Sequence, residues 1–396
     1  MKVKNKTIAT LGIFLLCLLY LWIQMNTKDA DFHSVENDNL SKIKRSTLDL
    51  NDTEILSYER VPLLTLFTTF SEREVTRFVI QNNTILNWCN LQRDFGYRLV
   101  VFYSINHTIE TLRETAYHAT QNIRHTTGDD QFACVINTIL LTEELTARGR
   151  PIFKNIYLEI QRRFRSKLYA YCNGDIIFHG AMFDASLLAV MHFTTENNLQ
   201  EFMIYGGRRE MPFFKQNQAK TLKTGNDTEI LNLGRQSRVK HIIALDYFIC
   251  SKDSFNWQQF PDFLVSVQAF DTFLAIYSNK IGIATFDVTL TSIVVHQAGA
   301  PKLKDDGYKD ARELNQFLFL NSVPGWNADM MGLKCMKYIT FVNKGITSVK
   351  TNPKYTSKTC VYPKPIFAPV LDKEELLNKN LRPYFRKDLD YYGGPA

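Results

Sequence analysis

The chain has 396 residues, of which 45% are hydrophobic and 22% are charged. This composition excludes a disordered or collagen-like chain, and the length is sufficient for a sizeable core. The 47 Lys and Arg residues exceed the 40 Asp and Glu residues, which gives a formal charge of +7 that we expect to be spread along the chain. A nucleic-acid-binding protein would carry a concentrated basic stripe, so we expect no nucleic-acid partner.

The first apolar segment spans residues 8–25 and carries no formal charge. As a helix it would reach roughly 27 Å, which is enough to cross a bilayer. Lys2, Lys4 and Lys6 precede it, so the positive-inside rule places residues 1–7 in the cytosol and the bulk of the chain in the lumen or outside. A cleaved signal peptide is the alternative, but the segment lacks a small-residue cleavage site. We therefore expect a single-pass type II signal anchor.

Two further features agree with a luminal compartment. Glycosylation sequons occur at Asn39, Asn51, Asn82, Asn106 and Asn226. Apart from Cys17 in the apolar segment, six cysteines remain, an even number that is compatible with disulfides in an oxidising lumen. Buried free thiols are the alternative, and the spacing does not determine which cysteines would pair.

The rest of the chain divides into three parts. Residues 26–58 are polar and aperiodic, which predicts a stem between membrane and domain. Residues 59–300 alternate short apolar runs with segments of helical character, which predicts an α/β domain with a mostly parallel sheet covered by helices on both faces. Residues 301–396 are rich in Lys, Pro and Tyr, and we expect an extension that packs on the domain.

The expected strands and helices follow in chain order. Strands are predicted at 61–70, 98–104, 132–137, 168–178, 202–205 and 241–250, where Val, Ile, Phe and Tyr are frequent. Helices are predicted at 72–91, 108–124 and 153–165, the last from apolar residues that recur every three or four positions.

The strand at 168–178 contains the main candidate for chemistry. Its apolar run is interrupted by Asn173, Gly174 and Asp175 before it resumes. A buried carboxylate needs a cationic partner, and ligands of open α/β sheets gather at the carboxyl ends of strands, so Asp175 is well placed for a metal ion. A turn- or helix-capping Asp is the alternative.

The surrounding motifs carry a family resemblance. They are the Asn-Gly-Asp-Ile strand end, YGGRREM from Tyr205, DYFIC from Asp246, FDTFLAIY from Phe270, and FDVT followed by His296 and Gln297. This series resembles GT-A-fold glycosyltransferases, a nucleotide-diphospho-sugar transferase superfamily, motif by motif over residues 61–297. The resemblance implies a Rossmann-like sheet, a nucleotide-sugar donor and a glycan or glycoconjugate acceptor.

The resemblance also implies roles for individual residues. Asn173 to Asp175 resembles the DXD element, with Asp175 as ligand of a divalent cation, Mn²⁺ or Mg²⁺, that contacts the donor diphosphate. His296 resembles the histidine that completes the metal site, although a structural histidine is the alternative. Asn173 departs from the pattern because an amide supplies no charge, which weakens the metal site or puts metal dependence in doubt.

Other residues are candidates for the acceptor and donor sides. Asp271 is the candidate general base and Asp246 a second acidic residue near the acceptor, with a solvated helix Asp and a backbone-bonded Asp as the respective alternatives. Arg208 and Arg209 suit clamping of phosphate. Thr68 stands, by analogy, where this fold receives the nucleotide base.

We therefore expect a luminal Golgi glycosyltransferase. A non-catalytic glycan- or nucleotide-sugar-binding module that retains the fold is the alternative, which the Asn173 departure favours. A sulfotransferase would need a phosphate loop near the start of the domain, and residues 65–75 contain neither the glycines nor the lysine for it.

Overall fold

The computed structural model describes most of the chain from residue 61 onward. The described residues are 61–70, 76–104, 106–211, 220–239, 245–297, 307–322, 332–356, Cys360 and Glu374. The predicted tail, anchor and stem, with Asn39 and Asn51, lie outside them. None of the helices found in these ranges is long and apolar enough to span a membrane.

The described elements belong to one compact unit that comprises residues 60–342 and 347–396. Residues 343–346 are grouped separately from this unit. A mixed sheet of nine strands forms the centre of the described structure, in the order β15-β14-β12-β8-β11-β6-β1-β2-β3. Its strands are β1 Leu64–Thr69, β2 Arg98–Tyr103, β3 Ile136–Leu140, β6 Leu168–Cys172, β8 Phe202–Tyr205, β11 Tyr247–Ser251, β12 Ala284–Asp287, β14 Tyr338–Asn343 and β15 Ile346–Thr351. Most pairs are parallel, as predicted, but β11 runs antiparallel to both β6 and β8.

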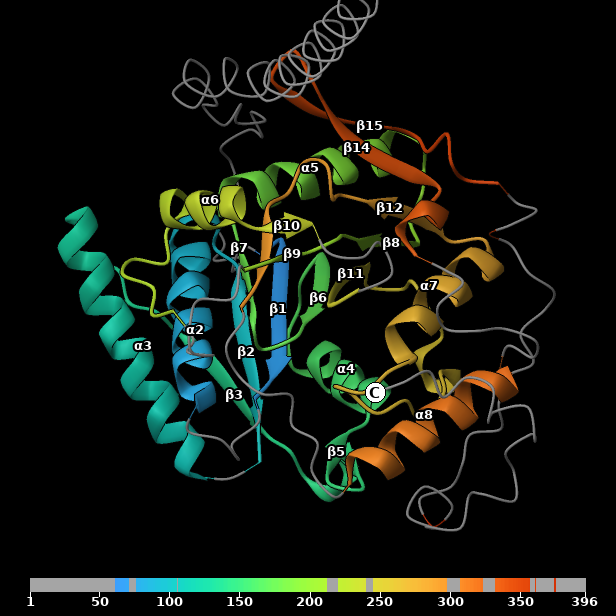
Figure 1. Cartoon of the computed structure of the whole chain (residues 1–396), viewed down its shortest axis with the longest axis horizontal. Helices are drawn as coiled ribbons and strands as arrows, with labels where there is room; N and C mark the ends of the chain where they lie inside the picture. Colours follow the sequence, from blue (N-terminus) through green and yellow to red (C-terminus); the bar gives the residue numbers. More distant parts are fainter. Residues whose placement is uncertain are drawn as a thin grey trace, which may run out of the picture. The chain divides into compact units, whose positions relative to one another are not determined.

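Helices cover both faces of this sheet. They are α2 Thr76–Phe95, α3 Asn106–Thr127, α4 Phe153–Arg163, α5 Gly180–Glu196, α6 Asp227–Gln236, α7 Phe270–Ile281 and α8 Tyr308–Ser322, with short 3-10 helices at Glu143–Leu145, Trp257–Gln259 and Leu333–Cys335. Buried residues of α4, α7 and α8 pack on one face, where Figure 1 shows these three helices together. Buried residues of α2 and α5 pack on the other face.

A second, smaller sheet of four strands has the order β10-β9-β13-β7. Its strands are β7 Ile176–Phe178, β9 Arg209–Glu210, β10 Arg238–Val239 and β13 Val294–His296, and a separate hairpin pairs β4 Thr146–Ala147 with β5 Arg150–Pro151. The predicted strand 168–178 is therefore wrong as one element, because it divides into β6 of the central sheet and β7 of the small sheet. A turn separates them, in which the amide of Ile176 donates to the carbonyl oxygen of Asn173 at 3.2 Å.

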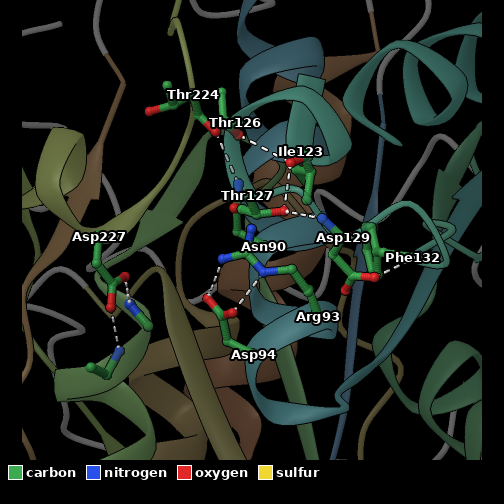
Figure 2. A network of polar contacts seen from close by, with 12 residues as sticks. Asn90, Arg93, Asp94, Ile123, Thr126, Thr127, Asp129, Phe132, Thr224 and Asp227 are labelled. Atoms are coloured by element: carbon green, nitrogen blue, oxygen red, sulfur yellow. Dashed lines mark hydrogen bonds and ion pairs between the residues drawn. The ribbon is translucent and has the colours of Figure 1, made fainter. Parts of the chain in front are cut away.

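Strand ends and helix starts show why local sequence sets these boundaries. The predicted strand 241–250 begins only at Tyr247 within the described residues, after Leu245 and Asp246. Helix α5 begins where the carboxylate of Asp227, which Figure 2 labels, accepts hydrogen bonds from the amides of Gly180 (2.5 Å) and Ala181 (2.8 Å). A carboxylate at this position satisfies amides that have no partner within the helix.

The described part of residues 301–396 takes part in the domain. Helix α8 packs on the core, and β14 pairs in parallel with β12, so the central sheet continues beyond residue 300. The cysteines divide between the two expectations: Cys89 bonds to Cys134 and Cys335 to Cys360, whereas Cys172 and Cys250 are buried free thiols.

Candidate functional site

The site lies where the central sheet and the small sheet meet. The turn Asn173 to Asp175 leads from β6 into β7. Gly174 is required there, because a Cβ atom on this residue would lie 2.6 Å from Cδ1 of Phe70 and 3.3 Å from the carbonyl oxygen of Thr69. The end of β1 therefore packs directly against the turn, and only glycine leaves room for it.

The small sheet brings Asp175 and His296 together. Strand β13 pairs with β7 so that His296 lies opposite Ile176, and the amide of Gln297 donates to the carbonyl oxygen of Asp175 at 2.9 Å. The Nε2 atom of His296 lies 3.3 Å from Oδ2 of Asp175. The other carboxylate oxygen, Oδ1, is buried and has no hydrogen-bond partner among the described residues.

Strand β9 and the residue before it add Glu210 and Arg208 to the same side. Because alternate residues of a strand face the same way, these two side chains point together while Arg209 points away. An Nη2 atom of Arg208 donates to Oε1 of Glu210 at 3.1 Å, and Arg208 also forms an ion pair with Asp246. Glu210 Oε1 lies 3.7 Å from Nδ1 of His296, its neighbour in the parallel pair of β9 and β13.

Asn173 occupies the space between these groups. Its amide nitrogen donates to Oδ1 of Asp246 at 2.9 Å, and its side-chain oxygen accepts from the hydroxyl of Tyr171 at 3.2 Å. The backbone amide of Asn173 also donates to the carbonyl oxygen of Asp246 at 2.9 Å. The asparagine thus binds the acidic residue at the start of β11, a role that a carboxylate at this position could not fill.

Asp271 lies in the first turn of α7, and one of its carboxylate oxygens accepts from the amide of Thr272 at 2.9 Å. The residue before the helix, Ala269, has a left-handed backbone with φ of 88°. Such a conformation is costly for a residue with a Cβ and persists only where the surroundings hold it. The helix start that carries Asp271 is therefore held in a strained position.

The three acidic residues have different pKa shifts. Burial raises the pKa of Asp175, but the nearby charges of His296, Arg208 and Arg77 outweigh burial and lower the pKa overall. Burial raises the pKa of Asp246, and the opposing charge of Arg208 only partly offsets this rise. Burial, together with the charge of Asp246, raises the pKa of Asp271 to about 7. Asp175 is therefore ionised at neutral pH, while Asp271 can gain or lose a proton there.

The remaining candidates lie apart from this cluster. Arg209 donates to the carbonyl oxygen of Gly234 at 3.3 Å, near the end of α6. Thr68 is fully buried in β1, and its hydroxyl lies 3.5 Å from the carbonyl oxygen of Thr69.

The sequons that fall within the described residues lie on α2, α3 and α6. Asn82 is exposed on α2, and its side-chain oxygen accepts from Thr115 at 2.8 Å. Asn106 begins α3, and Asn226 caps α6 by accepting from the amide of Glu229 at 3.0 Å. Glycosylation at these positions stays a prediction.

Sequence reasoning missed Glu210 and Gln297. Glu210 is two residues from Arg208 within the motif YGGRREM. Because alternate residues of a strand face the same side, this spacing could have indicated that Glu210 lies beside Arg208. Gln297 donates to Thr84 at 3.0 Å and accepts from Asn83 at 2.8 Å, which fastens the end of β13 to α2. Its role depends on contacts across more than 200 residues, for which the sequence contains no signal.

Comparisons with known proteins give only weak likenesses. No protein-family model and no curated protein matches this chain. Among solved structures, it is similar to HddC from Yersinia pseudotuberculosis at 11% identity and TM-score 0.23, with 48% of this chain and 76% of that one covered. It is similar to S. aureus TarS 1-349 at 10% identity and TM-score 0.30, with 67% of each chain covered. It is also similar to the inositol-1-phosphate CTP transferase from T. maritima at 10% identity and TM-score 0.31, with 64% of this chain and 96% of that one covered.

At such TM-scores these likenesses carry no argument about what the chain does.

Proposed function

We propose that this protein is a glycosyltransferase that moves a sugar from a nucleotide-diphosphate donor to a hydroxyl group of a glycan or glycoconjugate. The observation that carries the proposal is the cluster at the junction of the two sheets. There, an ionised Asp175 faces His296 at 3.3 Å, and the charge of Asp246 contributes to raising the pKa of Asp271 to about 7. Ionised and proton-accepting carboxyls in one site suit a reaction that creates an anionic leaving group while it removes a proton.

A divalent cation fits part of this site. Asp175 offers a buried carboxylate oxygen without a hydrogen bond, and His296 offers a ring nitrogen beside it. Within the described residues, however, no group of three or more His, Cys, Asp or Glu side chains is arranged to hold a metal. Asp175 and His296 would therefore hold Mn²⁺ or Mg²⁺ together with donor phosphate oxygens and water, and the bound ion would stabilise the charge on the leaving diphosphate.

The chain's own residues would divide the remaining work. The Asp271 carboxylate accepts the proton of the acceptor hydroxyl as the new bond forms between its oxygen and the anomeric carbon. The bond from that carbon to the diphosphate oxygen breaks, and the nucleoside diphosphate leaves. Arg208, fixed by Asp246 and Glu210, presents a guanidinium of fixed orientation next to the departing phosphates. We further propose a type II orientation in the Golgi membrane, from the apolar segment 8–25 and the sequons.

The test is donor binding and turnover by the full chain in detergent. Thermal shift against UDP- and GDP-sugars, with and without Mn²⁺, is expected to identify one donor that stabilises the protein. Asp175→Asn is expected to abolish turnover with little change in melting temperature, whereas Asp253→Asn, at an exposed carboxylate, is the matched control. A folded protein that responds to no nucleotide sugar contradicts the proposal. Donor binding without turnover by any acceptor favours the non-catalytic module.

A further inference from the structure

The positive charge of this chain is concentrated in one stretch. Residues 332–371 contain seven Lys and no Arg, Asp or Glu. The other 40 Lys and Arg residues are balanced by the 40 Asp and Glu residues, so this stretch alone accounts for the formal charge of +7. The expectation of a charge spread along the chain is therefore wrong.

Four of these lysines lie around the last two strands of the central sheet. Lys334, Lys337, Lys350 and Lys354 are all exposed. The Nζ atom of Lys350 lies 4.5 Å from the ring centroid of Phe341, and that of Lys337 lies 5.5 Å from the ring of Tyr338. Figure 1 shows β14 and β15, which carry or flank these lysines, at the edge of the sheet.

The backbone that carries the lysines is fixed from within. The side chain of the buried Asn352 donates to the carbonyl oxygens of Lys334 (3.2 Å) and Met336 (2.7 Å). The backbone amide of Asn352 donates to the carbonyl oxygen of Lys337 at 2.9 Å. Its side-chain oxygen accepts from the amide of Lys354 at 3.0 Å. The disulfide between Cys335 and Cys360 ties the same segment. These lysines are therefore held as an array, in contrast to charges scattered over a solvated helix face.

The array also lies near the acidic residue that ends β12. Lys354 is close enough to Asp287, at the end of β12, for its charge to oppose the rise that burial causes in the pKa of that carboxyl. Asp287 accepts from the hydroxyl of Thr289 at 2.5 Å, and Thr289 accepts from the amide of Gly207 at 2.7 Å. Gly207 immediately precedes Arg208, so these contacts link Asp287 through Thr289 to the backbone beside the site.

We propose that the surface formed by Lys334, Lys337, Lys350 and Lys354, with the ring of Phe341, binds an acidic glycan chain that carries sulfate or carboxylate groups. This basic hairpin surface offers ammonium groups to the anions and an aromatic ring to a sugar face. A glycan fits better than an anionic membrane because the ring beside the ammonium groups can pack on a sugar face. This binding does not depend on the proposed function.

Isothermal titration of the full chain in detergent tests the binding, with a chondroitin sulfate decasaccharide as the acidic probe and a maltooligosaccharide of equal length as the neutral one. The change is the quadruple variant Lys334→Gln, Lys337→Gln, Lys350→Gln and Lys354→Gln. Its matched control removes four exposed positive charges elsewhere through Arg165→Gln, Lys167→Gln, Arg238→Gln and Lys252→Gln. Melting temperatures verify that both variants fold.

The wild-type chain is expected to bind the acidic probe and not the neutral one. The hairpin variant is expected to raise Kd by about 10- to 100-fold, from the loss of four exposed charge pairs, and the control variant by less than about twofold. If the quadruple variant does not fold, Lys350→Gln and Lys354→Gln alone are each expected to raise Kd about two- to fourfold.

Three results would overturn the proposal: equal weakening in the hairpin and control variants, an unchanged Kd in the hairpin variant, or wild-type binding to phosphatidylserine vesicles in place of the acidic glycan. The nucleotide-sugar thermal shift separates this failure from a failure of the proposed function. Glycan binding without a thermal shift from any nucleotide sugar would refute the proposed transferase activity but not the proposed glycan-binding surface.

Discussion

Asp271 gives the sharpest test of the site's electrostatics, because its raised pKa has a cost for the folded state that can be measured without knowing any substrate. Burial and the charge of Asp246 raise this pKa from 3.8 to about 7. Between about pH 4 and pH 7 the folded chain therefore holds a proton that the unfolded chain has released. Since the folded state binds more protons in this window, its stability falls as the pH rises through it.

The perturbation is Asp271→Asn, which is neutral at every pH and can still accept the hydrogen bond from the amide of Thr272. A shift of about three pKa units corresponds to about 4 kcal/mol as a ceiling. Because Asp271 is partly exposed, solvent screening reduces this to on the order of 1 to 3 kcal/mol. We expect the variant and the wild type to be equally stable near pH 4, and the variant to be more stable by that amount at pH 8.

The assay is equilibrium unfolding in urea at pH 4, 6 and 8 with the disulfides intact, and Asp253→Asn is the control for an exposed carboxylate. The control is expected to follow the wild type at each pH. A stability difference between Asp271→Asn and the wild type that stays constant from pH 4 to pH 8 would refute the reasoning. So would a variant that is less stable than the wild type at pH 8.

Four other predictions follow from the same structure. If Asp271 is the general base, kcat/KM is expected to fall tenfold per pH unit below about pH 7, and a flat profile from pH 5 to 8 contradicts that role. Glu210→Gln removes the carboxylate that contacts both Arg208 and His296, and it is expected to weaken Mn²⁺ binding by about 10- to 100-fold. Electron paramagnetic resonance measures this binding. The control Arg209→Gln, on the other face of β9, is expected to leave Mn²⁺ binding unchanged. Gly174→Ala is expected to lower the free energy of unfolding in urea by about 1 to 3 kcal/mol, because its Cβ would overlap the Phe70 ring. Adding Phe70→Leu to this variant is expected to recover part of the loss. If Gly174→Ala alone leaves the stability unchanged, the close approach of Phe70 is contradicted. Replacing both Cys89 and Cys134 by Ser opens a loop of 45 residues and is expected to lower the free energy of unfolding by about 4 kcal/mol. The same change at Cys335 and Cys360 opens a 25-residue loop and is expected to lower it by about 3.5 kcal/mol. A variant as stable as the wild type would contradict the corresponding disulfide.

The sequence predicted the elements that local patterns control. Runs of Val, Ile, Phe and Tyr marked β1, β2, β6 and β8, because strands that are buried on both faces read as continuous apolar runs. The spacing of apolar residues marked α4. The interruption of an apolar run also drew attention to Asp175, since a carboxylate in such a place requires a partner.

Tertiary structure alone decided what those residues meet. Asp175 and His296 are neighbours because β7 and β13 pair antiparallel in the small sheet, which no local sequence pattern predicted. Arg208 pairs with Asp246 because β9 and the start of β11 converge from separate sheets. Cys89 bonds to Cys134, while Cys172 and Cys250, on adjacent strands, do not bond to each other. Hydrophobic period is a property of neighbouring residues and can be read along the chain. Strand order and register arise from contacts between distant segments, and they set every distance in the candidate site.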